Sequence, residues 1–188
     1  MTQRQRRVRD QAERGRRIVA AARELAEAEG WDAVTTRRLA ALIEYSQPVL
    51  YSHFPGGKDA IMTAAALEGF AELAEVLAAA RDRGVAGVAG AYVEFAEAKP
   101  ALYDAMFTLA SELPFARDDT PEVMQEAYAG LFAVVAPVAG DDTAGTLTEV
   151  FWSTLHGLIT LDRGRRLSPE HRDERLALVV ARFGARAG

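Results

Sequence analysis

The stretch that decides the fold is TTRRLAALIEYSQPVLYSHF, residues 35–54 of a chain of 188. Its apolar positions Leu39, Ala40, Ile43 and Leu50 have the spacing of two short helices that pack against each other. The small side chain of Ala40 permits a close crossing. A turn of three residues separates the two segments, which is the helix-turn-helix arrangement. Because many three-helix bundles share this pattern, it predicts the local fold more firmly than it predicts a function.

The ends of the predicted helices carry their own signals. Residues 10–29 show apolar positions at helical spacing, and Gly30 can end that helix because it has no Cβ. Thr35 or Thr36 can cap the second helix, and Ser46 can cap the third. Three helices are therefore expected before residue 55, with the third presenting its first turn to solvent.

The residues themselves carry a resemblance to a known family. The segments GWDAVTTRRLA (30–40) and LYSHFP (50–55), followed by Lys58, resemble the DNA-binding domain of the TetR/AcrR family of bacterial transcription regulators. The similarity extends over about residues 12–62, a third of the chain.

A second resemblance lies further along the chain. The segment FWSTLHG (151–157), with PALY (100–103) and Met106-Phe107 upstream, is similar to a ligand-binding domain named for its Trp, His and Gly motif. Together the resemblances imply an all-α homodimer with about nine helices per subunit. Residues 1–57 would be the N-terminal arm and helix-turn-helix domain. Residues 58–188 would form the ligand-binding and dimerisation domain, with 58–81 as the connecting helix.

The resemblance assigns DNA contacts residue by residue. Base edges would be read by the start of the third helix, at Gln47, Pro48 and Val49. Phosphates would be bound by Thr36, Arg37, Tyr51, His53 and Lys58. These roles suit the chemistry, because hydroxyls and cations donate to phosphate oxygens and the Gln47 amide can pair with adenine. Tyr51 could equally be a core aromatic.

One position departs from the family pattern. The turn carries Glu44 where the family usually has Gly, a residue that tolerates positive φ. Either the turn is built differently here, or Glu44 adopts the strained conformation.

Aromatic and Met residues in the second part are candidate walls of an effector pocket. They are Tyr103, Met106, Phe107, Met124, Tyr128, Phe132, Trp152 and His156. The same residues could simply fill a core. His156 lies one helical turn after Trp152, so it could orient a ligand or be a structural histidine.

The last two predicted helices have broad apolar faces, which suit the bundle of four helices that would join two subunits. The expected dimer contacts are Phe151, Leu155, Leu158, Ile159, Leu176, Val179, Val180 and Phe183.

Charge is unevenly distributed along the chain. The net charge is −5, but residues 1–60 carry 11 basic and 8 acidic side chains, whereas residues 61–188 carry 11 and 19. Seven of the basic residues are arginines within the first 17 positions. A basic end of +3 suits a phosphate backbone, while the remainder, at −8, would stay away from it.

Other classes are less compatible with the composition. A chain that is 49% hydrophobic is not disordered, and the absence of Cys excludes disulfides and thiol nucleophiles. The three histidines do not pair at metal-ligand spacing, so no metal site is expected. The sequence also shows no nucleophile–base arrangement and no cofactor loop, so no catalytic site or cofactor is expected. The apolar run after the basic start, Ile18–Ala22, is cut short by Arg23 and Glu24 and does not make an export signal. No apolar run is long enough for a membrane span, so we expect a cytoplasmic protein.

The leading hypothesis is a ligand-responsive, sequence-specific DNA-binding regulator and not an enzyme. We expect a repressor released from a palindromic operator in double-stranded DNA by a small apolar or aromatic effector. Two alternatives remain at this point: a constitutive DNA-binding dimer without an effector, and a small helical ligand carrier or enzyme.

Overall fold

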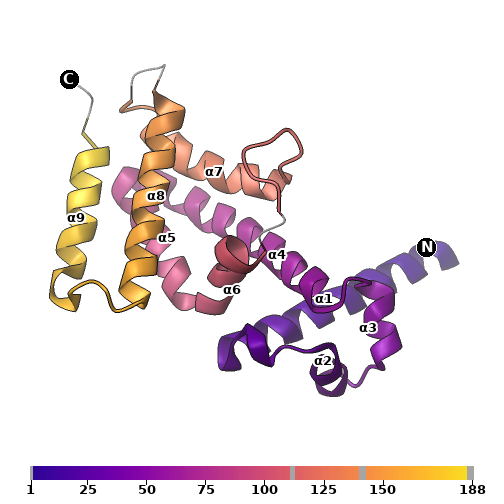
Figure 1. Cartoon of the computed structure of the whole chain (residues 1–188). Helices are drawn as coiled ribbons and strands as arrows, with labels where there is room; N and C mark the ends of the chain where they lie inside the picture. Colours follow the sequence, from indigo (N-terminus) through magenta and orange to yellow (C-terminus); the bar gives the residue numbers. More distant parts are fainter. Residues whose placement is uncertain (1, 111–112, 140–142, 186–188) are drawn as a thin grey trace. The chain divides into compact units, whose positions relative to one another are not determined.

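The computed structural model describes residues 2–110, 113–139 and 143–185. Every regular element in these ranges is a helix, and no strand occurs among them (Figure 1). The all-α fold class is therefore confirmed. No helix within the described ranges is long and apolar enough to cross a membrane.

The chain forms two compact units. The first contains residues 1–69 and 99–114, and the second contains residues 70–98 and 115–188. The division falls inside one continuous helix, α4 (Gly57–Ala80). The start of α4 and the segment that follows residue 98 thus pack with the first three helices, although both lie beyond the domain boundary predicted after residue 57.

The first unit is built around the predicted helix-turn-helix. Besides the first part of α4, its elements are α1 (Gln3–Glu29), the 3-10 turn η1 (Trp31–Ala33), α2 (Thr36–Leu42), α3 (Gln47–His53), α6 (Pro100–Asp104) and the π-helical turn η3 (Ala105–Leu109). Thr35 caps α2, because its hydroxyl accepts a hydrogen bond from the backbone N–H of Arg38 at 3.2 Å. Gly30 ends α1 with φ 83°, as its sequence position predicted.

Glu27 fastens α6 to α1 inside this unit. Its two carboxylate oxygens accept hydrogen bonds from the backbone N–H groups of Ala101 and Leu102, at 3.0 and 2.9 Å. A carboxylate at a helix N-terminus satisfies donors that have no partner within the helix and favours the helix dipole. The Trp31 indole N–H donates to the Ala101 carbonyl at 2.7 Å. Because η3 directly follows α6, these contacts also hold η3 against the first three helices.

The second unit is a bundle around a larger apolar core. Besides the rest of α4, its elements are the 3-10 turn η2 (Arg81–Arg83), α5 (Gly84–Ala98), α7 (Glu122–Val135), α8 (Ala144–Arg163), the 3-10 turn η4 (Pro169–His171) and α9 (Arg172–Phe183). Tyr92, Phe151 and Leu155 are fully buried in it. Gly130 lets α7 lie close to α4, because a Cβ there would be 2.9 Å from that of Leu77.

Candidate nucleic-acid interface and ligand pocket

The turn between α2 and α3 is made with Glu44 in the left-handed region, at φ 58°. The following backbone N–H, of Tyr45, donates to the Ala40 carbonyl at 2.9 Å and closes the turn. Of the two possibilities left by the sequence, Glu44 therefore adopts the strained conformation, which costs about 1–2 kcal/mol in a non-glycine residue. Its side chain is exposed.

The first turn of α3 is free to meet a partner. Gln47 and Pro48 are exposed and Val49 is half-buried, whereas Leu50 points into the core. The prediction that the Ser46 hydroxyl caps this helix is wrong, because Ser46 occupies the N-cap position but makes no capping hydrogen bond through its side chain. Pro48 in the first turn lacks an N–H, which leaves one donor fewer to satisfy there.

Two hydroxyls lie side by side next to this turn. The oxygens of Thr36 on α2 and Tyr51 on α3 are 3.4 Å apart, and the Tyr51 side chain is 47% exposed. Tyr51 is therefore not a plain core aromatic. Gly57, with φ 62°, begins α4 close to it, since a Cβ at that glycine would lie 3.5 Å from the tyrosine ring. Because one of the two hydroxyls donates to the other, the pair offers one remaining O–H donor on this surface.

The other predicted phosphate ligands lie in the same unit. Arg37 is exposed, and His53 and Lys58 are half-buried. The neighbouring Arg38 differs, because its guanidinium forms a two-point ion pair with Glu29. That hydrogen-bonded guanidinium holds the pKa of the Glu29 carboxyl below its usual value. Of the two adjacent arginines, Arg38 thus stabilises the fold, and Arg37 keeps its charge available.

Arg17 takes part in this surface, although the sequence singled it out only as one of seven N-terminal arginines. Its guanidinium donates to the Tyr45 hydroxyl at 3.0 Å and lies 5.2 Å from the centre of the ring. The contact is both a hydrogen bond and a cation–π interaction. It joins α1 to the residue that precedes the N-cap of α3, and it was not predictable from spacing because the two residues are 28 positions apart.

The second unit contains an open pocket of about 750 Å³. That volume lies in the range of pockets that hold small organic ligands. Its lining residues come from α7, α8 and the segment before α7, and they are Phe115, Ala116, Arg117, Asp118, Thr120, Met124, Gln125, Tyr128, Glu149, Trp152 and Ser153. The rings of Phe115 and Trp152 stack with centres 5.2 Å apart and 11° between their planes.

Polar groups in the pocket have specific partners. The Trp152 indole N–H donates to the hydroxyl of the buried Tyr92 at 2.9 Å, which fixes the indole plane. The Tyr128 hydroxyl donates to the Gly145 carbonyl at 3.2 Å. Burial, followed by the negative charge of Glu149, raises the pKa of Tyr128 above its usual value. Because its single hydroxyl proton is donated to Gly145, the Tyr128 oxygen can offer a ligand a hydrogen-bond acceptor.

Three of the eight predicted pocket residues line this pocket: Met124, Tyr128 and Trp152. Phe132 does not, because it is 38% exposed on α7 and contacts the Tyr128 ring with centres 6.4 Å apart. His156 is also absent from the lining, and its Nε2 lies 3.5 Å from the Thr160 hydroxyl. Sequence reasoning missed Phe115, which stacks on Trp152 from the segment that precedes α7 and carries no helical spacing.

The remaining three, Tyr103, Met106 and Phe107, belong to the first unit. Tyr103 and Met106 are buried there, and the rings of Tyr103 and Phe107 lie 4.7 Å apart. Met106 packs on Gly69 of α4, where a Cβ would come within 2.6 Å of its sulfur. Within that unit these side chains act as core.

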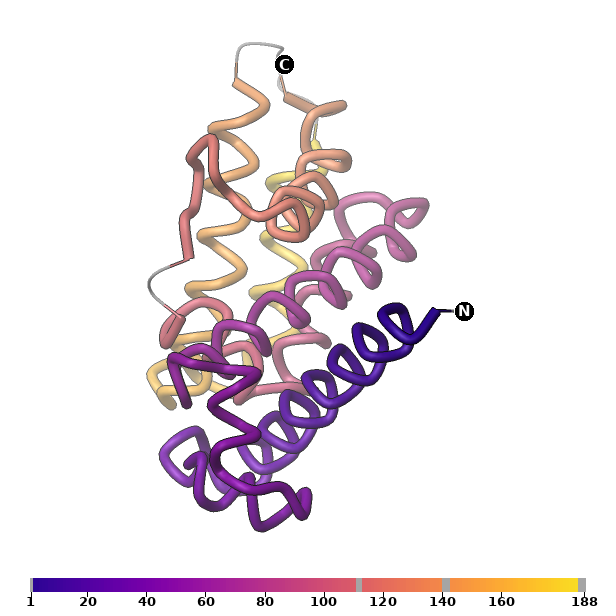
Figure 2. Tube along the Cα trace, turned by 90° about the vertical axis from the view of Figure 1, so that its right-hand side faces the viewer, coloured from indigo at the N-terminus to yellow at the C-terminus, as the bar shows by residue number. Residues whose placement is uncertain are grey.

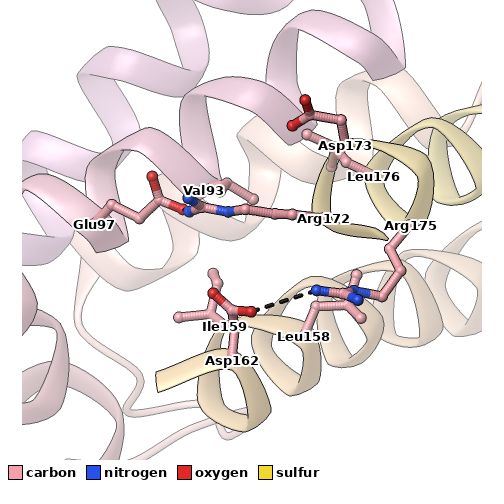
Figure 3. A pocket seen from close by; sticks show the side chains of 9 residues that line it. All are labelled: Val93, Glu97, Leu158, Ile159, Asp162, Arg172, Asp173, Arg175 and Leu176. Atoms are coloured by element: carbon pink, nitrogen blue, oxygen red, sulfur yellow. Dashed lines mark hydrogen bonds and ion pairs between the residues drawn. The ribbon is translucent and has the colours of Figure 1, made fainter. Parts of the chain in front are cut away.

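A smaller hollow of about 220 Å³ lies between α5, α8 and α9 (Figure 3). Two ion pairs border it, Arg172 with Glu97 and Arg175 with Asp162, the second at 3.4 Å. Arg175 also donates to the Ser168 carbonyl at 2.8 Å. These contacts attach the start of α9 to the other two helices, so both arginines are used within the chain.

The predicted dimer contacts divide into two groups. Phe151 and Leu155 are fully buried, and Ile159 and Val179 are 5% and 8% exposed. These four pack the helices of one chain together and leave little surface for a partner, and their predicted contact with a second subunit stays a prediction. A helix with apolar residues on several sides gives no sequence signal for which side faces its own core. Leu158, Leu176, Val180 and Phe183 keep partial exposure.

A different apolar set lies at the surface of α8 and α9. Val150, Leu161 and Leu178 are exposed by 50%, 41% and 56%. These three side chains are accessible to a second copy of the chain, unlike the four that are buried.

Comparisons with known proteins identify the family. Residues 18–65 match the model of bacterial regulatory proteins of the tetR family, and residues 85–183 match the tetracyclin repressor-like C-terminal domain. The chain belongs to the TetR family. An uncharacterised HTH-type transcriptional regulator of Mycobacterium tuberculosis is 30% identical over 154 residues, which cover 77% of this chain and 68% of that protein.

Solved structures agree with the fold of this TetR-family chain. A protein of unknown function from Rhodococcus sp. RHA1 superposes with a TM-score of 0.74 at 27% identity, covering 90% of this chain and 93% of that one. A regulatory protein in the tetR family from Rhodococcus RHA1 gives 0.59 at 22% identity, with coverages of 93% and 98%. The family models and the curated relative, and not these structures, make the chain a transcription regulator and not an enzyme.

Proposed function

We propose that this TetR-family regulator is a repressor that leaves a palindromic operator when a small apolar or aromatic molecule binds its second unit. The observation that carries the DNA-binding part is the exposed first turn of α3 beside the paired hydroxyls of Thr36 and Tyr51. Gln47, Pro48 and Val49 read base edges, and the hydroxyls, with Arg37, His53 and Lys58, bind phosphates.

The repressor acts as a dimer. Two recognition helices then enter successive major grooves, with half-site centres about 34–36 Å apart or a multiple of that distance. The exposed Val150, Leu161 and Leu178 of α8 and α9 supply the apolar contact between subunits. In this arrangement Val49 contacts a thymine methyl group, which compensates for the few donors on α3.

The pocket beside Trp152 supports the effector part. A stacked pair of aromatic rings and the Met124 side chain favour a flat apolar ligand, and the Tyr128 hydroxyl supplies one directional hydrogen bond. An effector releases the operator only if it binds the DNA-free shape of the dimer more tightly than the DNA-bound shape. This pocket favours the effector-responsive regulator over the constitutive alternative.

DNA binding is tested on duplexes that the intact protein enriches from a random pool. Lys58→Ala should weaken binding to all duplexes and reduce the salt dependence, because it removes one phosphate contact. Gln47→Ala should instead change which duplexes are enriched. A matched control is Lys99→Ala, the only other lysine of the chain. If neither Lys58→Ala nor Gln47→Ala differs from this control, α3 is not the recognition helix.

Effector binding is tested by screening aromatic compounds for a rise in melting temperature and then titrating a hit into the protein–DNA complex. A true effector releases the duplex, and Trp152→Ala abolishes the response. A hit that binds this pocket and leaves DNA affinity unchanged would refute the switch, while leaving DNA binding intact.

A further inference from the structure

The second unit has another hollow, which the proposed function does not use. It is an open groove of about 540 Å³, lined by η2, the start of α5, the end of α7 and the end of α9. Figure 2 shows α7 next to the turn that joins α4 to α5, which forms one side of the groove. The volume lies in the range of pockets that bind small organic molecules.

The groove is separate from the pocket beside Trp152. The two hollows share no lining residue. Helix α7 borders both of them with different turns, since Met124 lines the pocket and Val134 lines the groove. Ten positions separate these two residues, which is about 15 Å along a helix. One chain therefore has room for two ligands at the same time.

The inner wall of the groove is apolar. Val85 on α5 and Val134 on α7 are only 8% and 7% exposed. Pro137, Val138 and Val180 are half-buried and extend this wall toward the opening. None of the described residues that line the groove is aromatic. Such a wall gains free energy by removing an aliphatic chain from water, and it has no ring on which a flat ligand could stack.

The rim of the groove is cationic. Turn η2 places Arg81, Asp82 and Arg83 there, and all three side chains are exposed. Among the residues that the structure describes, no ion pair involves Arg81 or Arg83. Asp82 is the one acid of the described lining, so the rim keeps a net positive charge. An anion is therefore attracted to this edge.

A glycine determines where one of these arginines lies. A Cβ at Gly87 of α5 would overlap the Cβ of Arg83 and lie 3.2 Å from its Nε. The missing side chain at Gly87 thus allows the stem of Arg83 to lie along α5, at the edge of the groove. A side chain that is already restricted in the free protein loses less conformational entropy when it binds a ligand.

We propose that this groove binds a small amphiphilic anion, namely a monomeric aliphatic carboxylate. Its chain lies on the valine wall, and its head group accepts charge-assisted hydrogen bonds from Arg81 and Arg83. The site goes beyond the proposed function, because it is neither the DNA surface nor the pocket beside Trp152. A second copy of the chain is a poorer occupant. Leu178, which supplies the proposed dimer contact, lies about 200° around α9 from the groove residue Val180.

The test variant is R81Q/R83Q, which removes both cations of the rim and leaves the valine wall intact. The matched control R165Q/R166Q removes two exposed arginines elsewhere in the second unit. Circular dichroism and melting temperatures establish that both variants keep the native fold. The probe is sodium decanoate below its critical micelle concentration, and isothermal titration calorimetry measures its affinity.

The native chain and the control should bind decanoate alike, and R81Q/R83Q should bind it tenfold or more weakly, because hydrogen bonds to two guanidinium groups are lost. Affinity should rise about fourfold with each CH₂ group added between octanoate and decanoate. Neutral decanol should bind the native chain and R81Q/R83Q equally. Equal decanoate affinities in all three proteins, or an affinity that does not depend on chain length, would overturn the proposal.

The place of binding is checked with bromoundecanoate, because bromine quenches tryptophan fluorescence on contact. The groove has no tryptophan in its described lining, whereas Trp152 lines the other pocket. Binding that requires Arg81 and Arg83 and leaves the fluorescence unchanged supports the groove. Quenching in proportion to all of the binding would place the anion beside Trp152 and refute the second site. Neither outcome bears on the proposed binding to DNA.

Discussion

Exposed arginines of the first unit differ from two paired arginines of the second. On the first unit, Arg4, Arg6, Arg7 and Arg37 present their charges to solvent, on the unit whose helix α3 also exposes its first turn. On the second unit, Arg172 and Arg175 form ion pairs that attach α9 to α5 and α8. Because these side chains are exposed, we expect their replacement on the first unit to cost little stability. On the second unit, Trp152 lines the pocket and also donates a hydrogen bond to the hydroxyl of the buried Tyr92.

The largest expected effect lies in the core of the second unit. Phe151→Ala removes a fully buried ring from α8, and we expect a loss of about 3–5 kcal/mol in the free energy of unfolding. Chemical denaturation measures it. Val150→Ala, at the neighbouring 50% exposed position, should cost less than about 0.5 kcal/mol. Similar costs for both would mean that the α8 faces are assigned incorrectly.

A change on the first unit should affect binding and spare stability. Arg37→Ala removes an exposed cation, so we expect affinity for an enriched duplex to fall about tenfold at low salt with an unchanged melting temperature. Anisotropy and thermal denaturation provide the two readouts. The neighbouring change Arg38→Ala breaks the ion pair with Glu29 and should act mainly on the fold. A lower melting temperature for Arg37→Ala and a lower DNA affinity for Arg38→Ala would contradict the roles assigned to these two arginines.

An intermediate case is Trp152, which serves the pocket and the core together. Trp152→Phe keeps an aromatic ring against Phe115 and loses the hydrogen bond to Tyr92, which should cost about 1 kcal/mol of stability. Denaturation curves of this variant and of Tyr92→Phe, combined with the double variant, give the coupling energy. Additive single effects would show that the hydrogen bond contributes nothing.

The smallest effect concerns the titration of Tyr128. The pKa of Tyr128 is raised in the folded chain, so the protonated hydroxyl contributes to the free energy of unfolding. This contribution is complete below the usual tyrosine pKa and is lost as the pH rises through the raised pKa. Glu149→Gln should bring this pKa back toward its usual range. Tyrosinate absorbance, with Tyr128→Phe to identify the signal, follows the shift. An unchanged titration in Glu149→Gln would leave burial as its only cause.

The fold was predictable from the sequence where local rules suffice. Thr35, Gly30 and the Leu39–Leu50 pattern placed the helix-turn-helix, because caps and apolar spacing act over a few residues. The Arg17–Tyr45 and Glu27–Ala101 contacts were not predictable, since they join residues 28 and 74 positions apart.

The pocket was predicted only in part for a related reason. An aromatic stripe shows that side chains are apolar, but not which unit they join, so Tyr103 and Met106 were grouped with Trp152. The same limit applies to α8, where spacing did not distinguish the buried Phe151 from the exposed Val150. In both cases the missing information is the position of the neighbouring helix.

Glu27 gives α1 a mechanical role. Its carboxylate holds the first backbone groups of α6, and α6 follows directly on α5 through Lys99. Two hydrogen bonds to a charged group, with the Trp31 indole as a third restraint, therefore oppose separation of the start of α6 from α1. One exposed carboxylate near the end of α1 thus ties a segment 74 residues later in the chain to the helix that precedes the helix-turn-helix.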